Sequence, residues 1–534
     1  MSETIVIIGA GMAGLSAGCY AQMNGYSSQI FEMDVHPGGL ATSWKRGPYV
    51  FEAGPRVVSG TSGTSKAHQL WEELGILDQR GVYYYDELAC YEGSDGRRFH
   101  MYADINRLRD HMLELSPKDR EPIEELISAL RAFTRMELPV DLTPSNPLEF
   151  VQLGTDMLPV MVPVMRWRNV TVGEFARKFR DPLLREALPQ MFPLATPDLP
   201  MIMLLKTVAK MSDHEAGFPI GGAAQLGDDL AKRYLALGGT IQCRTKIEQI
   251  VVEDASANGD RHDRVTGVRL KNGTVVVADM VISAADGRST IFDLLQGLYR
   301  SKAVDHYYKD LRTSYSVLKV SLGVRRDMRG EPSTLDLSLR QPLALGNREY
   351  GRMVVNHYCF DPTMAPAGCS SLGIWFDADF EYWLSLRNDR EAYRAAKQQV
   401  SERVIRALDQ RYPGLAAQVE AVDVATPATY ERFTGNWRGA YSGWAITNEK
   451  VNMIMTQGMR KTLPGLDRFY MIGHWVEPGG GVDLSVASGR DVIKDICHRD
   501  GKPFAAGQEP GHALPQQTSE ALEQTQAALD GGSG

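Results

Sequence analysis

The start of the chain constrains the fold most, because it reads as a strand, a glycine-rich turn, a helix and a second strand. Residues 4–8 form a β-branched run that is typical of a strand buried in a parallel sheet. Residues 13–24 have helical composition, and residues 28–33 predict the second strand, which carries Glu32 near its end. This order of elements, with an acidic residue at its end, predicts a βαβ unit that binds a dinucleotide.

Three glycines and one carboxylate carry that prediction. Gly9 permits the sharp turn, Gly11 lets the backbone approach a pyrophosphate, and Gly14 allows the helix to pack closely on the strand. The N-terminus of the helix offers N–H groups and the positive end of its dipole to the anion. Glu32 is placed to accept hydrogen bonds from ribose hydroxyls, and a carboxylate there disfavours the extra phosphate of NADP. The predicted contacts of this unit are Gly9, Gly11, Met12, Ala13, Gly14, Glu32 and Met33.

Glycines recur after the second strand, in residues 37–44 and 51–56. The first segment reads Pro-Gly-Gly-Leu-Ala-Thr-Ser-Trp, and the second reads Phe-Glu-Ala-Gly-Pro-Arg. Both resemble the glycine pair and the extended segment with which flavin amine oxidases and phytoene desaturase-like enzymes bind FAD. Glycines there leave room for the diphosphate and the flavin to approach backbone amides. The resemblance implies contacts with FAD at Gly38, Gly39, Leu40, Gly54, Pro55 and Arg56.

Two distant segments extend the resemblance. Residues 245–253 are similar to the returning β-strands of these enzymes, which implies that Ile247 lies by the adenine and Ala285 nearer the diphosphate. Residues 469–482 repeat the order strand, glycine-rich turn and helix start, and they resemble the segment that closes over the flavin. A helix N-terminus there would stabilise negative charge on the reduced flavin. The implied contacts are Gly473, Gly481 and Val482.

Residues 39–45 and 218–222 indicate the branch that the chain resembles, which is the phytoene desaturase and carotenoid isomerase-like branch of the flavin amine oxidase superfamily. The resemblance implies an FAD-dependent oxidoreductase that acts on carbon–carbon bonds of a long apolar substrate, such as a carotenoid, another isoprenoid or an unsaturated fatty acid. Hydride transfer through flavin N5 would support desaturation or double-bond isomerisation. Two alternatives stay open: an amine or amino-acid oxidase on the same fold, and a non-catalytic FAD-binding protein.

The chain of 534 residues is too long for one hydrophobic core, which usually stops growing near ~250–300 residues. We expect an α/β fold with a Rossmann-type FAD-binding domain, built on a parallel sheet and a small β-meander. An α+β substrate domain with an antiparallel sheet should accompany it. The expected boundaries are 1–65, 215–305 and 455–504 for the FAD-binding domain, 66–214 and 306–454 for the substrate domain, and 505–534 for a disordered tail.

Charge and cysteine usage exclude several classes of protein. A net charge of −8 argues against a nucleic-acid-binding surface. The six cysteines form no CxxC pair, which fits a reducing compartment, and no spacing typical of metal ligands is visible. Non-covalent FAD is expected, since Cys497 lies beyond the flavin-facing turn and Cys369 lies in another segment. The first residues lack the features of a signal peptide, so a cytoplasmic protein is expected.

The methionine-rich segment 151–165 admits two interpretations. It is interrupted by Asp156, Pro159 and Pro163, so it falls short of the ~18–20 apolar residues of a spanning helix. Over 139–211 as a whole, short helices broken by Pro182, Pro189, Pro193, Pro197 and Pro200 are expected. Flexible thioethers suit an adaptable apolar tunnel or a peripheral membrane contact. A plain helical core explains the same residues equally well.

Three residues are candidates for catalysis because the family resemblance places their segments near the flavin: Arg56, His474 and Glu477. Among them, His474 is the candidate for a general acid or base, because an ordinary imidazole titrates near neutrality. A hydrogen bond to backbone or a salt bridge is the alternative role for each residue. Aromatic residues such as Trp375, Trp437 and Trp444 either line a substrate pocket or pack a sheet. No second nucleotide fingerprint is visible, so electrons are expected to leave to oxygen or a quinone.

Overall fold

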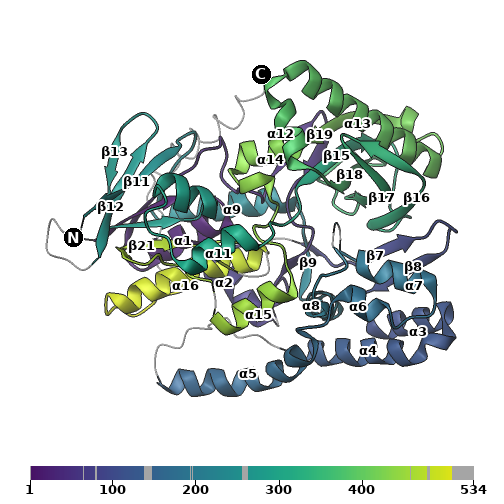
Figure 1. Ribbon diagram of the computed structural model, residues 1–534, viewed down its shortest axis with the longest axis horizontal. Helices are drawn as coiled ribbons and strands as arrows, with labels where there is room; N and C mark the ends of the chain where they lie inside the picture. Colours follow the sequence, from purple (N-terminus) through teal and green to yellow (C-terminus); the bar gives the residue numbers. More distant parts are fainter. Residues whose placement is uncertain are drawn as a thin grey trace.

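The computed structural model (Figure 1) describes residues 2–63, 65–77, 81–136, 147–192, 194, 196–254, 262–457, 459–477 and 481–507. The predicted disordered tail, 505–534, falls mostly outside these residues, and so does the turn 478–480. Within the described part, the chain builds two large sheets with helices around them.

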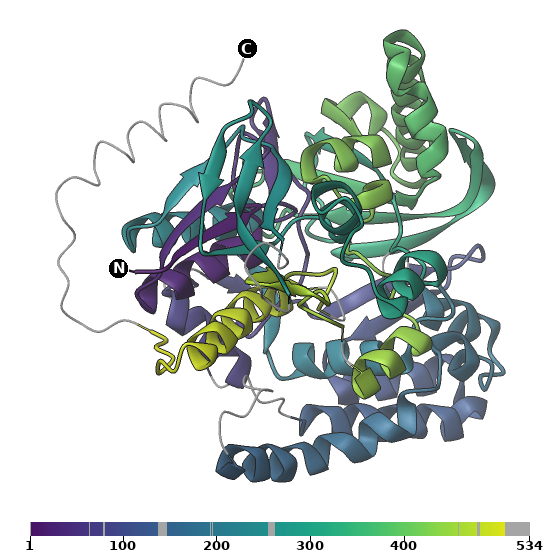
Figure 2. The same ribbon diagram turned by 60° about the vertical axis from the view of Figure 1, so that its left-hand side comes forward.

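The first sheet is parallel and contains strands from both ends of the chain. Its order is β10 (Thr240–Gln242), β2 (Ser27–Phe31), β1 (Thr4–Ile8), β14 (Met280–Ser283) and β21 (Phe469–Met471). Side chains alternate between two faces, because successive residues of a strand point to opposite sides. Ile5 and Ile7 pack with α1 (Met12–Met23), α9 (Gly222–Ala236) and α16 (Val482–Arg499). Figure 2 shows α16, in yellow, beside the purple N-terminal strands and helix.

A small meander covers the other face of this sheet. It consists of the antiparallel strands β11 (Ile247–Glu253), β12 (Asp263–Leu270) and β13 (Val275–Val277), and β20 (Leu466–Asp467) pairs with β12 in parallel. Val6 and Ile8 of β1 share a buried cluster with Val265 and Val268 of the meander. The parallel sheet is therefore buried on both faces, which explains the continuous apolar run at the start of the chain.

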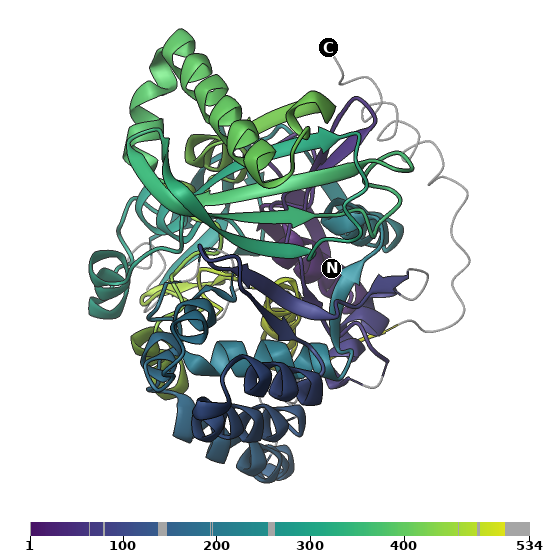
Figure 3. The same ribbon diagram turned by 90° about the vertical axis from the view of Figure 1, so that its right-hand side faces the viewer.

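The second sheet has seven strands and is antiparallel except at the β16–β7 pair. Helix α13 (Arg390–Arg411) covers one face, where Leu318, Val320 and Leu322 are buried. Figure 3 shows this helix lying across the long green strands. The order is β19 (Val419–Ala425), β15 (Val317–Val324), β18 (Ser370–Asp377), β17 (Arg348–His357), β16 (Thr334–Leu345), β7 (Glu87–Glu92) and β8 (Arg98–Tyr102).

A helical layer packs against the end of the second sheet. Its core includes Leu108, Leu130, Leu184 and Leu205. The helices are α3 (Ile105–Leu115), α4 (Arg120–Thr134), α5 (Pro147–Trp167), α6 (Val172–Ala176), α7 (Pro182–Ala187) and α8 (Met201–Ser212). The expectation of short helices broken by proline over 139–211 holds near Pro182 and Pro189, where α6 and α7 have 5 and 6 residues. It does not hold for α5, which is one helix of 21 residues that contains Pro159 and Pro163.

The other elements connect these layers. They are β3 (Ser43–Arg46), β4 (Tyr49–Glu52), β5 (Val58–Ser59), α2 (Gln69–Leu74), β6 (Val82–Tyr83), β9 (Ala216–Pro219), α11 (Lys302–Asp310), α12 (Phe380–Ser385), α14 (Pro427–Thr434) and α15 (Asn448–Gln457). The mixed α/β fold with one parallel and one antiparallel sheet confirms the predicted fold class. The domain boundaries given above stay a prediction. Among the described residues, no helix is both long enough and apolar enough to cross a membrane.

Candidate functional site

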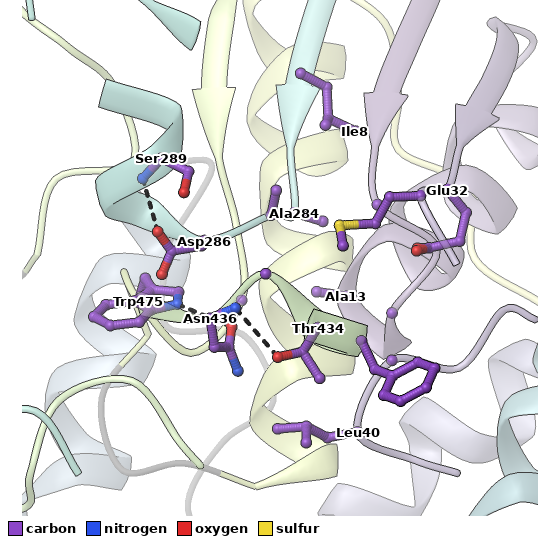
Figure 4. Close-up of a pocket in the computed structure, with 18 of the residues that line it drawn as sticks. Ile8, Ala13, Glu32, Leu40, Ala284, Asp286, Ser289, Thr434, Asn436 and Trp475 are labelled. Atoms are coloured by element: carbon purple, nitrogen blue, oxygen red, sulfur yellow. Dashed lines mark hydrogen bonds between the residues drawn. The ribbon is translucent and has the colours of Figure 1, made fainter. Parts of the chain in front are cut away.

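A cavity of about 670 Å³ opens at the carboxyl ends of the parallel strands, within the ~300–1,000 Å³ usual for ligand pockets. Ile8, Phe31, Ala284 and Ile472 line it where β1, β2, β14 and β21 end, which is where open α/β sheets bind ligands. Segments from both ends and the middle of the chain form its wall (Figure 4). The residues predicted to contact a cofactor that line it are Gly9, Gly11, Met12, Ala13, Glu32, Met33, Gly38, Gly39, Leu40, Pro55, Ile247, Ala285, Gly473, Gly481 and Val482.

The glycines of the first turn have distinct roles in the structure. Gly9 has a φ of +96°, a conformation that side chains other than glycine rarely adopt. A Cβ on Gly14 would overlap the carbonyl oxygen of Gly9, so Gly14 is a packing residue and does not line the cavity. A Cβ on Gly11 would meet nothing within 4 Å. Protein packing therefore does not require glycine at position 11.

Glu32 is a buried carboxylate at the end of β2, with 7% of its surface exposed. One oxygen accepts a hydrogen bond of 2.7 Å from the N–H of Ala10, and the other accepts one of 2.8 Å from the N–H of Asp34. Burial raises the pKa of Glu32, and these two donors oppose that effect. The first turn and the acid are thus held together, and each carboxylate oxygen keeps a lone pair that can accept from a sugar hydroxyl.

The glycine pair packs directly on the first turn. The N–H of Gly38 donates to the carbonyl of Ala10 at 2.8 Å, and a Cβ on Gly39 would lie 3.2 Å from the Cα of Gly11. Gly54 serves a different purpose, because a Cβ there would overlap the Cβ of Ala223 at the start of α9. Gly54 does not line the cavity, so its small size is explained by helix packing.

Arg56 and Glu477, two of the three catalytic candidates, do not line the cavity. Arg56 donates to the Asn356 side chain at 2.8 Å and to the Ser333 carbonyl at 3.1 Å, and its guanidinium lies 4.9 Å from the ring centre of Tyr85. Glu477 forms an ion pair with Lys461. Both side chains are therefore committed to contacts within the protein.

His474 lines the cavity, but its titration differs from the sequence-based expectation. Burial, with a smaller effect from the charge of Lys450, lowers the pKa of His474 to about 4. The imidazole is therefore neutral near pH 7 and is a poor proton donor there. Lys450 is itself buried and donates to the carbonyl of Trp444 at 3.1 Å.

Asp286 is a site residue that sequence reasoning missed. It lies just beyond β14 on the side of the cavity opposite Glu32 (Figure 4), and 3% of its surface is exposed. Its carboxylate accepts from the N–H of Ser289 at 2.7 Å and from the N–H of Trp437 at 2.8 Å. Burial raises the pKa of Asp286 to about 6. The available signal was an acidic residue directly after a predicted buried strand. Its contact with Trp437 could not be predicted, because the two residues are far apart in the sequence.

The segment that Asp286 holds forms another part of the cavity wall. Thr434, Gly435 and Asn436 line the cavity, and the Asn436 side chain donates to the carbonyl of Ala440 at 3.0 Å. A Cβ on Gly435 would lie 3.5 Å from the Met33 sulfur, so this wall reaches the end of β2. The hydrogen bond from Trp437 to Asp286 thus ties this segment to the end of β14 in the parallel sheet.

The family profile described as flavin containing amine oxidoreductase matches residues 12–497. This chain belongs to that family. The protein is therefore a flavin-dependent oxidoreductase, and most of the predicted nucleotide contacts line the cavity. As in the sequence-based prediction, the relatives include carotenoid-modifying enzymes.

The chain is 24% identical to the chloroplastic prolycopene isomerase of Arabidopsis thaliana, over 91% of this chain and 81% of the relative. It is also 24% identical to the neurosporene-forming phytoene desaturase of Rhodobacter capsulatus, over 92% of this chain and 93% of the relative. A solved oxidoreductase from Methanosarcina mazei matches with a TM-score of 0.58 and 16% identity, over 92% of this chain and 100% of that one. Putrescine oxidase matches with a TM-score of 0.58 and 14% identity, over 93% and 99%. These structures confirm the fold of a flavin amine oxidoreductase.

Proposed function

We propose that the protein binds FAD non-covalently in this cavity and acts on carbon–carbon double bonds of a long apolar substrate. The observation that carries the proposal is the open space above Gly11, next to a helix N-terminus and a buried acid. These are the features that a pyrophosphate and its neighbouring ribose require. No cysteine is among the described residues that line the cavity, which supports non-covalent binding.

Different residues are proposed to contact different parts of FAD. The turn from Gly9 to Ala13 and the pair Gly38–Gly39 hold the diphosphate, while Glu32 accepts from the adenosine ribose. Ile247, which lines the cavity, is proposed to lie by the adenine, and Ala285, which also lines it, nearer the diphosphate. Gly473 and the start of α16, at Gly481 and Val482, face the flavin end, where the helix N-terminus favours negative charge.

The reaction proposed is desaturation or double-bond isomerisation of a carotenoid, another isoprenoid or an unsaturated fatty acid. The two relatives named above, an isomerase and a desaturase, support this choice over amine oxidation. Bound FAD supplies an acceptor for a hydride from carbon. Trp475 lines the cavity, and its ring meets that of the buried Trp444 edge to face, with the ring centres 5.0 Å apart, so this part of the wall is apolar and tightly packed. Net desaturation also requires a base or water to take the proton from the neighbouring carbon, and oxygen or a quinone to take two electrons from the reduced flavin.

Two measurements test this proposal. The purified protein should show the two absorbance bands of a flavin, and precipitation should release a compound with the mass of FAD. Incubation with phytoene, neurosporene or cis-carotenes in detergent, followed by chromatography, should reveal a new or isomerised carotenoid. Peroxide release with amines, without any change in the carotenoids, would favour an amine oxidase and overturn the proposed reaction.

We propose in addition that α5 contacts a membrane surface from the cytoplasmic side, where the apolar substrate dissolves. Helix α5 lies at the edge of the molecule, away from both sheets (Figure 1). Val151 and Val162 on this helix are 61% and 74% exposed, and Met161 and Met165 are also exposed. Exposed apolar groups of this kind often mark membrane contacts. Val162→Glu should reduce sedimentation with liposomes while leaving thermal unfolding unchanged, and equal sedimentation of both proteins would contradict the contact.

A further inference from the structure

A connecting segment, residues 434–442, forms part of the cavity wall and is hydrogen-bonded beside both sheets. We call this segment the strap. It begins with the last residue of α14 and contains one short helical turn at Trp437–Gly439. The strap residues that line the cavity are Thr434, Gly435, Asn436, Tyr441 and Ser442. A bound molecule that fills the cavity therefore contacts both halves of the strap.

The second half of the strap is attached beside the second sheet. The hydroxyl of Ser316 donates to the carbonyl of Arg438 at 2.8 Å, and the N–H of Ser442 donates to the hydroxyl of Ser314 at 2.8 Å. Both serines directly precede β15. This half of the strap is therefore held in place by the start of a central strand of the second sheet.

The first half of the strap is attached to the parallel sheet through Asp286. One carboxylate oxygen accepts from the N–H of Trp437 at 2.8 Å, although the two residues are 151 positions apart. The other oxygen accepts from the N–H of Ser289 at 2.7 Å, at the start of the helical turn that follows β14. Capping a helix requires only one acceptor, whereas a carboxylate has two. The second oxygen of Asp286 is thus used for the strap.

The turn between these two attachments is strained. Arg438 has a φ of +57°, which residues with a side chain rarely adopt, and Gly439 follows with a φ of +61°. A Cβ on Gly439 would lie 2.5 Å from the carbonyl oxygen of Pro427. Such a turn persists only when its surroundings hold it. The hydrogen bonds of Trp437 to Asp286 and of Arg438 to Ser316 supply that support on either side.

The strap lies beside an opening of the cavity. Phe433, directly before the strap, and Met33, just beyond β2, both line the cavity and are 46% and 38% exposed. Asn436 is oriented by two hydrogen bonds, from its own N–H to the hydroxyl of Thr434 at 3.2 Å and from Trp475 Nε1 to its side-chain oxygen at 3.5 Å (Figure 4). The strap is therefore placed to cover a bound molecule where the cavity meets solvent.

We propose that the strap closes over bound FAD and that Asp286 is the positioning residue that keeps it closed, by accepting the hydrogen bond from the N–H of Trp437. This inference rests on the proposed function, because it takes FAD as the molecule in the cavity. Asp286 acts on FAD through the strap, so its loss should affect how fast FAD leaves more than how stably the apoprotein folds.

The first test measures the release of FAD from Asp286→Ser. Serine has one acceptor oxygen and is a good helix cap, so the variant keeps the cap on Ser289 and loses the contact with Trp437. Holoprotein is diluted far below its Kd for FAD, and the change of flavin fluorescence gives the rate of release. Release should be about tenfold or more faster than in the wild-type protein, as expected for the loss of a hydrogen bond to a charged group. Ser316→Ala removes the attachment on the other side and should speed release by a smaller factor, because that bond joins neutral groups.

The matched control is Asp181→Ser. Asp181 caps α7 through the N–H of Leu183 at 2.8 Å and pairs with the exposed Arg97 at 3.1 Å, and it does not line the cavity. This variant also keeps a cap and loses a second contact, and it should release FAD at the wild-type rate. If Asp286→Ser releases FAD at the wild-type rate, or if both variants speed release equally, Asp286 does not hold the strap over FAD.

Hydrogen exchange of the wild-type protein provides a second measurement in case Asp286→Ser fails to fold. FAD should slow the exchange of amides in residues 434–442 by about tenfold or more, because a closed strap opens less often. Exchange in α13, which lies on the other side of the second sheet, should not change. Equal exchange of the strap with and without FAD would overturn the inference. A protein that binds no FAD would refute the proposed function itself, whereas bound FAD with unchanged release and exchange refutes only the strap.

Discussion

Replacing Gly11 and Gly14 separately by alanine should separate cofactor binding from folding. Gly11 has φ −71° and ψ 177°, which alanine adopts without strain, and its Cβ would meet no protein atom within 4 Å. Gly11→Ala should therefore raise the apoprotein's free energy of unfolding by about 0.4–1 kcal/mol, because the unfolded chain loses freedom. Gly14→Ala places a methyl group against the Gly9 carbonyl and should lower it by about 1–3 kcal/mol.

Gly11→Ala should weaken binding of FAD, although it stabilises the apoprotein. The methyl group of Gly11→Ala occupies the space where a pyrophosphate approaches the backbone, and the loss of one charge-assisted hydrogen bond costs about 1.5–3 kcal/mol. The Kd for FAD should then rise about tenfold or more, and each tenfold step removes about 1.4 kcal/mol of the stabilisation that saturating FAD gives. Thermal unfolding with and without FAD, together with a fluorescence titration of the apoprotein, measures both quantities. If Gly11→Ala binds FAD as tightly as the wild-type protein, the pyrophosphate does not lie against this glycine and the assignment of the cavity is wrong.

Three further predictions follow from the buried charges. Burial raises the pKa of Asp286 in the folded state to about 6, above its usual value of 3.8, so the folded state binds an extra proton between these values. The free energy of unfolding should therefore fall as the pH rises from about 4 to 6, and Asp286→Asn should lack this fall. A difference in unfolding free energy between the two proteins that is constant over this range would contradict the prediction. Arg490→Met leaves the buried Glu73 without its 2.7 Å ion pair and should lower the free energy of unfolding by about 3–5 kcal/mol in urea titrations, whereas the exposed Lys302→Met should change it little. Because the pKa of His474 is about 4, its titration should not affect turnover between pH 6 and 9, and His474→Gln should keep the shape of the pH–rate profile. If the variant instead loses an inflection near neutrality, His474 acts as a general acid or base.

The part of the cavity at the first turn was predictable because its signals are local. Gly9, Gly11, Glu32 and the β-branched strand lie within one short unit, where each residue type has a specific physical reason. The glycines at 38, 39 and 473 followed from family resemblance, and each has a positive φ in the structure.

The rest of the cavity wall was less predictable because its residues meet only through tertiary structure. Asp286 directly follows a predicted strand, and only the fold brings its carboxylate to the N–H of the distant Trp437. Arg56 was predicted to be a site residue, but it does not line the cavity. Its neighbour Pro55 does, whereas the Arg56 side chain donates to Asn356. Tertiary contacts and side-chain direction, which decide both cases, are not encoded in nearby residues.

The position of β1 at the centre of the parallel sheet has a consequence during synthesis on the ribosome. Ile5 pairs with Met280, so one edge of β1 stays open while more than half of the chain is made. At about 5–20 residues per second, this interval lasts on the order of tens of seconds. An apolar strand with an open edge is a site for aggregation, so the nascent chain is expected to need chaperones. Gly481 and Ser485, which line the cavity, are made later still, so the wall of the cavity is complete only after residue 485 has been made.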